Sequence, residues 1–233
     1  MDTPGPHRFE YTADLHRLRL LLATLADQTS QILTEATVAV TARAATAGVH
    51  TATVGLRAAC QTLDDDLVVL LARQSPVAGD LHLVMASLRI TMAVQRMGEL
   101  ADHIAAIADL RAPTVTVPAG LRPTLTGLGR LCADQAHRLA DALRADDPVA
   151  AAGCVVAGDD PIDRIHRQLM TTVTDPDWPH GVQRAVDLTL LSRYYERYAD
   201  QAATAARRLT RLHRLPPLPD GLLLSPQVGI HPR

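Results

Sequence analysis

Apolar positions recur every three or four residues along most of the chain, which is the period of an amphipathic α-helix. The first such run lies within the first fifty residues. Its apolar positions are Leu15, Leu18, Leu22, Leu25, Ile32, Leu33 and Ala36. Proline, glycine and short polar stretches interrupt the pattern at intervals, as they do between helices. The pattern therefore predicts long helices joined by short connections.

Six helical segments follow from this pattern. They are predicted at about residues 9–47, 49–74, 80–110, 121–146, 149–173 and 182–215. Pro161 is expected to interrupt the fifth segment, because proline removes a backbone N–H and kinks a helix. Arg111–Pro118 (RAPTVTVP) is predicted to be a linker, since prolines bracket its β-branched residues.

The third helix of each half carries a similar motif. QRMGE spans residues 95–99 in the first half, and ERYAD spans residues 196–200 in the second. Internal repeats of helices are typical of paired bundles. We therefore expect an all-α fold of two tandem three-helix bundles. The predicted units are a first repeat at 1–110, a linker at 111–118, a second repeat at 119–215 and a disordered tail at 216–233.

Composition agrees with a helical fold and narrows the function. Of the 233 residues, 47% are hydrophobic but only 3% are aromatic, which favours packed helices over sheets. The formal net charge of −2 gives no global field that would attract nucleic acid or an anionic membrane. We expect neither nucleic-acid binding nor membrane insertion.

The compartment is predicted from segments that the sequence lacks. No stretch approaches the roughly 18 uninterrupted apolar residues of a membrane span. The first eight residues have no apolar core of a secretory signal. Cys60, Cys132 and Cys154 are widely spaced and form no CxxC pair, so a zinc site or a disulfide framework is not expected. These observations predict a soluble cytoplasmic protein.

Four segments carry a resemblance to a known family. They are Gln74–Leu81 (QSPVAGDL, with His82 where arginine is usual), Asp159–Asp163 (DDPID), Asp175–Val182 (DPDWPHGV) and Glu196–Asp200 (ERYAD). Together they resemble the PhoU family over about residues 8–215, and within it the actinobacterial PhoY-type branch. The resemblance implies a pair of three-helix bundles, often dimeric.

The same resemblance implies a function. PhoU proteins hold down phosphate uptake and phosphate-starvation signalling when phosphate is plentiful. They act as adaptors between the ATPase subunit of the phosphate-specific ABC transporter and a sensor histidine kinase. A non-enzymatic homodimer is therefore expected. The alternative is a structural, metal-binding helical dimer without a signalling role.

Glu196 and Asp200 are the candidate functional residues, because a spacing of four places both carboxylates on one helix face. One interpretation is a solvated face balanced by Arg193 and Arg197. The other is a surface site for a hard cation such as Mg²⁺, Mn²⁺ or iron, which oxygen ligands suit. The resemblance implies that the remaining metal ligands would be Asp159 and Asp163.

Two features qualify the metal hypothesis. Asp160, Pro161 and Asp163 have the pattern of a helix start, and a restart there would move Asp159 away from Asp163. In the first half, the corresponding carboxyl pair is replaced by Gln95 and Glu99. The neighbouring helix of that half offers Thr53 and Arg57 in place of acids. A first-half metal site is therefore expected to be lost or much weakened.

Other hypotheses rest on fewer residues. His103, four residues after Glu99, is either a substitute metal ligand or a histidine at the surface or between helices. A carboxylate-bundle enzyme would use E-x-x-H pairs, which the predicted helices lack. The sequence also contains no P-loop, GxSxG or HExxH motif and no glycine-rich helix start that would hold phosphate.

Overall fold

Helices make up nearly all of the chain that the structure describes. The structure is a computed structural model that describes residues 6–73, 78–156 and 160–211. Its helices are α1 (Pro6–Ala42), α2 (Ala47–Arg73), α3 (Ala78–Arg111), η1 (Ala119–Leu121), α4 (Arg122–Arg144), α5 (Pro148–Val156), α6 (Asp160–Val173) and α7 (Gly181–Arg211). No strand occurs in these residues, so the prediction of an all-α fold is confirmed.

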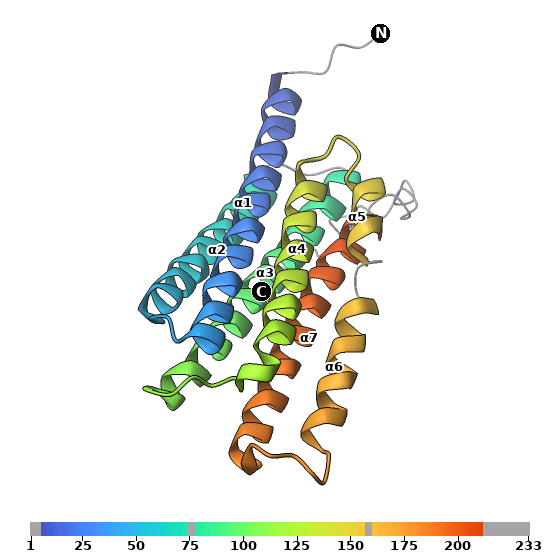
Figure 1. Ribbon diagram of the computed structural model, residues 1–233. Helices are drawn as coiled ribbons and strands as arrows, with labels where there is room; N and C mark the ends of the chain where they lie inside the picture. Colours follow the sequence, from blue (N-terminus) through green and yellow to red (C-terminus); the bar gives the residue numbers. More distant parts are fainter. Residues whose placement is uncertain (1–5, 74–77, 157–159, 212–233) are drawn as a thin grey trace, which may run out of the picture.

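Four long helices form the middle of the molecule. α1 packs on α4 and α3 packs on α7, so each pair joins one helix from each half of the chain. α2 lies against α1 and α3 on one flank, whereas α5 and α6 lie against α4 and α7 on the other (Figure 1). The two halves, α1 to α3 and α4 to α7, therefore bury their open faces against each other.

Two helix boundaries differ from the predicted ones. α1 ends at Ala42 rather than near residue 47, because Arg43 adopts the left-handed backbone conformation, with φ of 62°. The predicted fifth helix is present as α5 and α6. Pro161 is the second residue of α6, a position where proline fits because the first turn leaves its N–H groups unbonded.

Several predicted features fall on residues that the structure does not describe. The Gln74–Val77 part of the predicted junction, residue Asp159 and the tail at 216–233 are among them. The division into two domains at residues 111–118 stays a prediction. Within the described ranges, no helix combines the length and the apolarity that a membrane span requires.

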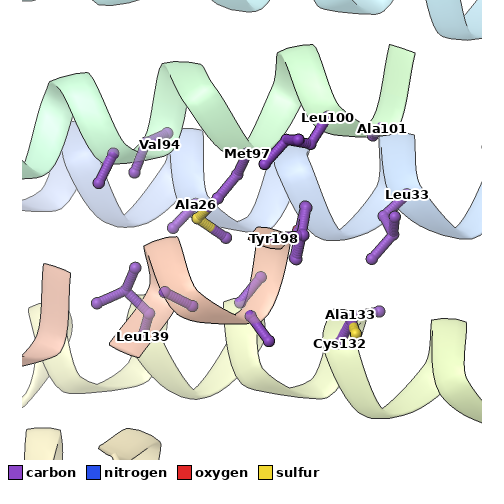
Figure 2. Close-up of a cluster of buried hydrophobic side chains, with 14 of the residues drawn as sticks. Ala26, Leu33, Val94, Met97, Leu100, Ala101, Cys132, Ala133, Leu139 and Tyr198 are labelled. Carbon is purple, nitrogen blue, oxygen red and sulfur yellow. The ribbon is translucent and has the colours of Figure 1, made fainter. Parts of the chain in front are cut away.

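The core fills the space where the four central helices meet. Figure 2 shows side chains from all four: Ala26 and Leu33 of α1, Val94, Met97, Leu100 and Ala101 of α3, Cys132, Ala133 and Leu139 of α4, and Tyr198 of α7. Each of these residues is at most 6% exposed. Burial of apolar surface between the two halves is therefore a main source of stability, at about 25 cal/mol per Å².

Two buried tyrosines place polar atoms inside this apolar interface. The Tyr195 hydroxyl lies 2.8 Å from Thr37 Oγ1, and the Tyr198 hydroxyl donates to Thr29 Oγ1 at 3.0 Å. Both tyrosines are fully buried, and burial raises the pKa of each phenol far above its usual range. Because buried polar groups need partners, these pairs fix how α7 sits along α1.

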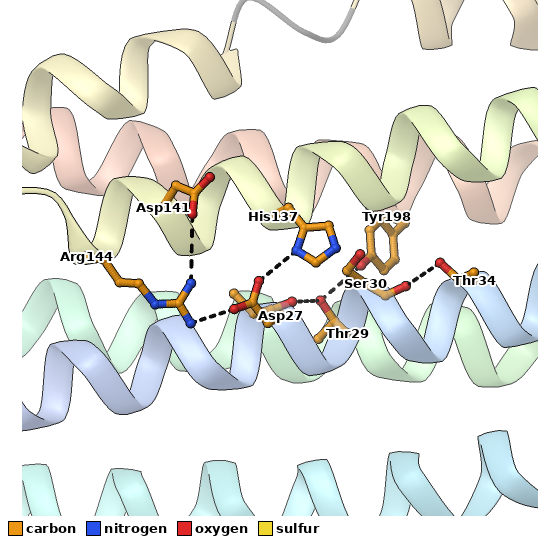
Figure 3. A network of polar contacts seen from close by, with 9 residues as sticks. Asp27, Thr29, Ser30, Thr34, His137, Asp141, Arg144 and Tyr198 are labelled. Atoms are coloured by element: carbon orange, nitrogen blue, oxygen red, sulfur yellow. Dashed lines mark hydrogen bonds and ion pairs between the residues drawn. The ribbon is translucent and has the colours of Figure 1, made fainter.

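Charged residues link the halves at two further places. On α4, His137 and Arg144 both contact the carboxylate of Asp27 on α1, at 2.8 Å and 2.5 Å (Figure 3). At the end of α3, Arg111 donates two hydrogen bonds to Asp187 of α7, at 2.6 Å and 2.8 Å. A bidentate pair of this kind has directional geometry that apolar packing lacks.

Removing the Tyr198 hydroxyl and removing the Thr29 hydroxyl are expected to lower the free energy of unfolding by different amounts. Tyr198→Phe should lower the free energy of unfolding by about 1 kcal/mol, because Thr29 keeps its bond to the Ala26 carbonyl. Thr29→Val should lower it by about 1–3 kcal/mol, because the Tyr198 hydroxyl is then buried without an acceptor. Urea denaturation of both variants measures the difference.

The double variant and a matched substitution serve as controls. Thr29→Val/Tyr198→Phe should lose less than the sum of the single losses, since no hydroxyl is left unpaired. Thr34→Val changes an exposed threonine on the same helix, whose hydroxyl donates to the Ser30 carbonyl, and should change stability by less than about 0.5 kcal/mol. Additive losses would contradict the proposed pairing.

His50 joins the start of α2 to the end of α3. Its Nδ1 lies 2.6 Å from Asp102 Oδ1, and its Nε2 lies 2.8 Å from Asp109 Oδ2. Hydrogen bonds to Asp109 and Asp102 raise the pKa of His50. A hydrogen bond from Thr46, together with His50, lowers the pKa of Asp109. With a carboxylate at each ring nitrogen, the imidazole is favoured in its doubly protonated, charged form.

The stabilising effect of His50 should depend on pH. Because folding raises its pKa above 6.5, its contribution is complete below about pH 6.5 and is lost as the pH rises through the folded value. We expect His50→Gln to lower the free energy of unfolding by at most ~1 kcal/mol at pH 6, since the side chain is 37% exposed and partly screened. The deficit should shrink at pH 9. His16→Gln, at an exposed position without a carboxylate partner in the described residues, should show no such trend.

Candidate functional site

The acidic pair on α7 lies beside the core rather than in it. Leu191, Tyr195 and Tyr198 of α7 point inward and are fully buried. The Glu196 side chain is 15% exposed and accepts a hydrogen bond from Arg193 at 2.7 Å. Asp200, one turn further on, is half-buried. The pair is therefore less solvated than the predicted open face.

The electrostatics of Glu196 reflect this position. Desolvation raises the pKa of its carboxyl group, and the charge of Asp200 raises it further. The charges of Arg193, His166 and Arg197 act in the opposite direction without cancelling the shift. Two carboxylates held close in a partly desolvated place repel each other, and a bound cation would relieve that repulsion.

The neighbouring helix α6 contributes residues of two kinds. Asp163 is exposed, and its backbone carbonyl accepts a bond from Arg167. His166 is half-buried, with Nδ1 2.7 Å from Ser192 Oγ on α7. Sequence reasoning missed His166, although its spacing of three from Asp163 places the two residues on one side of α6. His166 lies near enough to Glu196 for its charge to act to lower the pKa of that carboxyl group.

The predicted set of four ligands is only partly described. Glu196 and Asp200 lie together, whereas Asp159 lies outside the described residues. Within residues 6–73, 78–156 and 160–211, no three His, Cys, Asp or Glu side chains are grouped so that they could hold a metal ion. Asp163 thus does not complete a three-ligand group with the pair on α7. The four-ligand site stays a prediction.

The equivalent position on α3 is surrounded by positive charge. Glu99 accepts hydrogen bonds from Gln95 at 3.1 Å and from Arg96 at 2.9 Å, and Arg57 of α2 lies 3.6 Å away. Desolvation acts to raise the pKa of Glu99, but these donors and charges outweigh it and lower the pKa. The single carboxylate here is already neutralised by the protein's own cations.

Thr53, which stands in place of an acid, and His103, the possible substitute ligand, both have other contacts in the structure. Thr53 is buried, and its hydroxyl donates to the Val49 carbonyl on the same helix. The His103 ring packs against Tyr194 of α7, with centroids 5.3 Å apart. The interpretation of His103 as a histidine between helices is therefore confirmed.

Comparisons with known proteins agree with this architecture. The PhoU domain family matches residues 125–209, which span α4 to α7. Two solved structures share the fold with a TM-score of 0.74. They are PhoU from Pseudomonas aeruginosa, which is 20% identical and covers 88% of this chain and 99% of its own, and the phosphate transport system regulatory protein PhoU from Streptococcus pneumoniae, which is 18% identical with 87% and 96% covered.

Relatives with higher identity come from mycobacteria. A Mycobacterium tuberculosis protein named phosphate-specific transport system accessory protein PhoU homolog 2 is 40% identical over 146 residues, which are 63% of this chain and 68% of the relative. Homolog 1 of that organism is 33% identical over 160 residues, with 69% and 71% covered. The identity, the matched domain and the shared fold together show that this chain belongs to the PhoU family.

Proposed function

We propose that this protein regulates phosphate uptake as an accessory of the phosphate-specific transport system. The observation that carries the proposal is its 40% identity over 146 residues to mycobacterial proteins with that name. The helical arrangement common to this chain and the PhoU structures agrees with the same role. An accessory of this kind works by binding other proteins, so the proposed function is not enzymatic.

The finer part of the proposal follows from the family resemblance. The protein acts in the cytoplasm as a homodimer and holds phosphate-starvation signalling down when phosphate is plentiful. It does so by contacting the ATPase subunit of the phosphate ABC transporter and a phosphate-sensing histidine kinase. The competing proposal, a structural metal-binding dimer without signalling, predicts the same fold and differs only in what deletion of the gene does.

Deletion of the gene in its host should switch on a phosphate-starvation reporter in high-phosphate medium. The wild-type gene should restore low output, because the regulator again holds the kinase in its inactive state. We expect Glu196→Ala/Asp200→Ala to restore at most half of the repression, since the acidic pair belongs to one of the four segments that carry the family resemblance. Reporter fluorescence per cell measures the outcome.

A matched variant separates the motif from general charge effects. Asp134→Ala/Asp141→Ala removes two exposed carboxylates from α4 and should repress like the wild type. Direct binding of the purified transporter ATPase subunit and of the cytoplasmic part of the kinase then tests the adaptor role. A silent reporter after deletion would reject the regulatory proposal and favour the structural dimer.

We also propose that the acidic pair on α7 holds a divalent cation. The repulsion that raises the pKa of Glu196 supports this proposal, because a cation beside Asp200 would reverse the unfavourable charge interaction. Two carboxylates are sufficient protein ligands for Mg²⁺ or Mn²⁺ when waters complete the coordination. The Arg193 contact opposes binding, so the affinity is expected to be modest.

Thermal unfolding with and without added cation tests this proposal. At a concentration one hundred times Kd, a cation bound only to the folded state adds about 2.7 kcal/mol, which raises Tm by several degrees in a chain of this size. Glu196→Gln/Asp200→Asn should lose this shift, yet without metal at pH 7 it should be at least as stable as the wild type, because the repulsion is gone. Asp134→Asn/Asp141→Asn should behave like the wild type. An unchanged wild-type Tm with Mg²⁺, Mn²⁺ and Fe²⁺ would reject the site.

A further inference from the structure

A groove between α3 and α7 is lined by three arginines from both halves of the chain. Arg89 and Arg96 come from α3, and Arg208 comes from α7. Gln201 and Thr204 of α7 add neutral hydrogen-bonding groups, and the whole groove encloses about 540 Å³. The lining thus combines guanidinium, amide and hydroxyl donors on two facing walls.

The charge of this lining is strongly unbalanced. The lining contains three arginines but only one carboxylate, that of Glu99. This carboxylate already forms ion pairs with Arg96 and with Arg57 of α2. In the part of the chain that the structure describes, the side chains of Arg89 and Arg208 have neither an ion pair nor a hydrogen bond. Arg96 contacts Glu99 through Nη1, which leaves most of its five N–H donors free for another acceptor.

We propose that this groove binds an anion that carries several phosphoryl groups, such as a polyphosphate chain or a nucleoside triphosphate. Planar guanidinium groups bind phosphate oxygens in a bidentate manner, so the three arginines that line this groove favour phosphoryl groups over single-point anions. Asp200 of the acidic pair does not line the groove, but it directly precedes Gln201 and lies one turn before Thr204 on α7. The proposal does not depend on the regulatory function.

The spacing of the arginines favours an extended ligand over a single phosphate. Arg89 and Arg96 are seven residues apart on one helix, which is two turns or roughly 10 Å along its axis. Arg208 approaches from the opposite wall. A volume of about 540 Å³ lies within the range of roughly 300–1,000 Å³ that small organic ligands occupy. Met92, which is 67% exposed, adds an apolar contact at the same groove.

Sequence reasoning did not find this site because it looked for a glycine-rich helix start. Such a start binds phosphate through backbone N–H groups, whereas the groove offers side chains alone. Arg89 and Arg96 share a face of α3 by their spacing, but nothing in the sequence places Arg208 opposite them. Only the packing of α3 on α7 brings the three together.

Calorimetric titration of the full chain with sodium tripolyphosphate in metal-free, low-salt buffer tests the proposal. We expect saturable binding of one ligand per chain that weakens as salt is added. Arg89→Gln/Arg208→Gln should bind at least tenfold more weakly. Arg130→Gln/Arg138→Gln removes two exposed arginines from α4 and should stay within twofold of the wild type.

Titration with ATP distinguishes the two candidate ligands. ATP that binds as tightly as tripolyphosphate would support a nucleotide, and ATP that binds more weakly would support a phosphate chain.

A second variant controls for unfolding. Arg89→Lys/Arg208→Lys keeps both charges but loses the planar guanidinium groups, and should bind three- to tenfold more weakly even if the Gln variant fails to fold. Four results would overturn the proposal: no saturation at millimolar ligand, equal loss in the α4 control, inorganic phosphate as tight as tripolyphosphate, or a glutamate-rich peptide of equal charge that binds as tightly.

Discussion

The buried hydroxyl pairs between α1 and α7 set the register on which the rest of the structure depends. Apolar packing between the two halves is strong but non-directional, so it would tolerate a slide of one helix along the other. Tyr195 and Tyr198 each need a partner in this dry interface, and Thr37 and Thr29 provide one only at the observed alignment. Gly129 of α4 allows α1 to pack closely beside Thr37, because a Cβ at Gly129 would lie 2.5 Å from Thr37 Oγ1. These four hydroxyl groups therefore select one alignment of α1 and α7 among those that apolar packing alone would allow.

That register determines which surface residues become neighbours. The Asp27 and Arg111 ion pairs lie at other points of the same interface between the halves, so rotation of one half against the other would break them. With α3 fixed against α7, His103 meets Tyr194, and the arginines of both helices line one groove. The polar surface between the halves is therefore a consequence of core packing, and core variants that shift the register should also alter it.

Helix periodicity was enough to predict an all-helical fold. The candidate sites depend in addition on which helices pack together and in what register. The first helix follows from the spacing of its apolar residues, and the break at Pro161 follows from proline chemistry. The end of α1 was predicted too late in the sequence, because Arg43 adopts a left-handed backbone conformation that glycine usually takes at a helix end. His166 and Arg208 were missed for another reason. Each acts through a neighbour on a different helix, and a single sequence does not give the register between helices.

The two halves differ in local charge at equivalent positions of α7 and α3, and the pKa values of Glu196 and Glu99 shift in opposite directions. On α7 the motif keeps two carboxylates, and desolvation together with mutual repulsion raises the pKa of Glu196, which favours a cation. On α3 the same position holds Gln95 and Glu99, and Arg57 and Arg96 lower the pKa of the remaining carboxyl group. A cation there would be repelled by two guanidinium groups, whereas an anion would be attracted by them and by Arg89. The two halves therefore carry surfaces of opposite charge preference, because a few charged side chains differ between α3 and α7 while both helices have apolar residues facing the core.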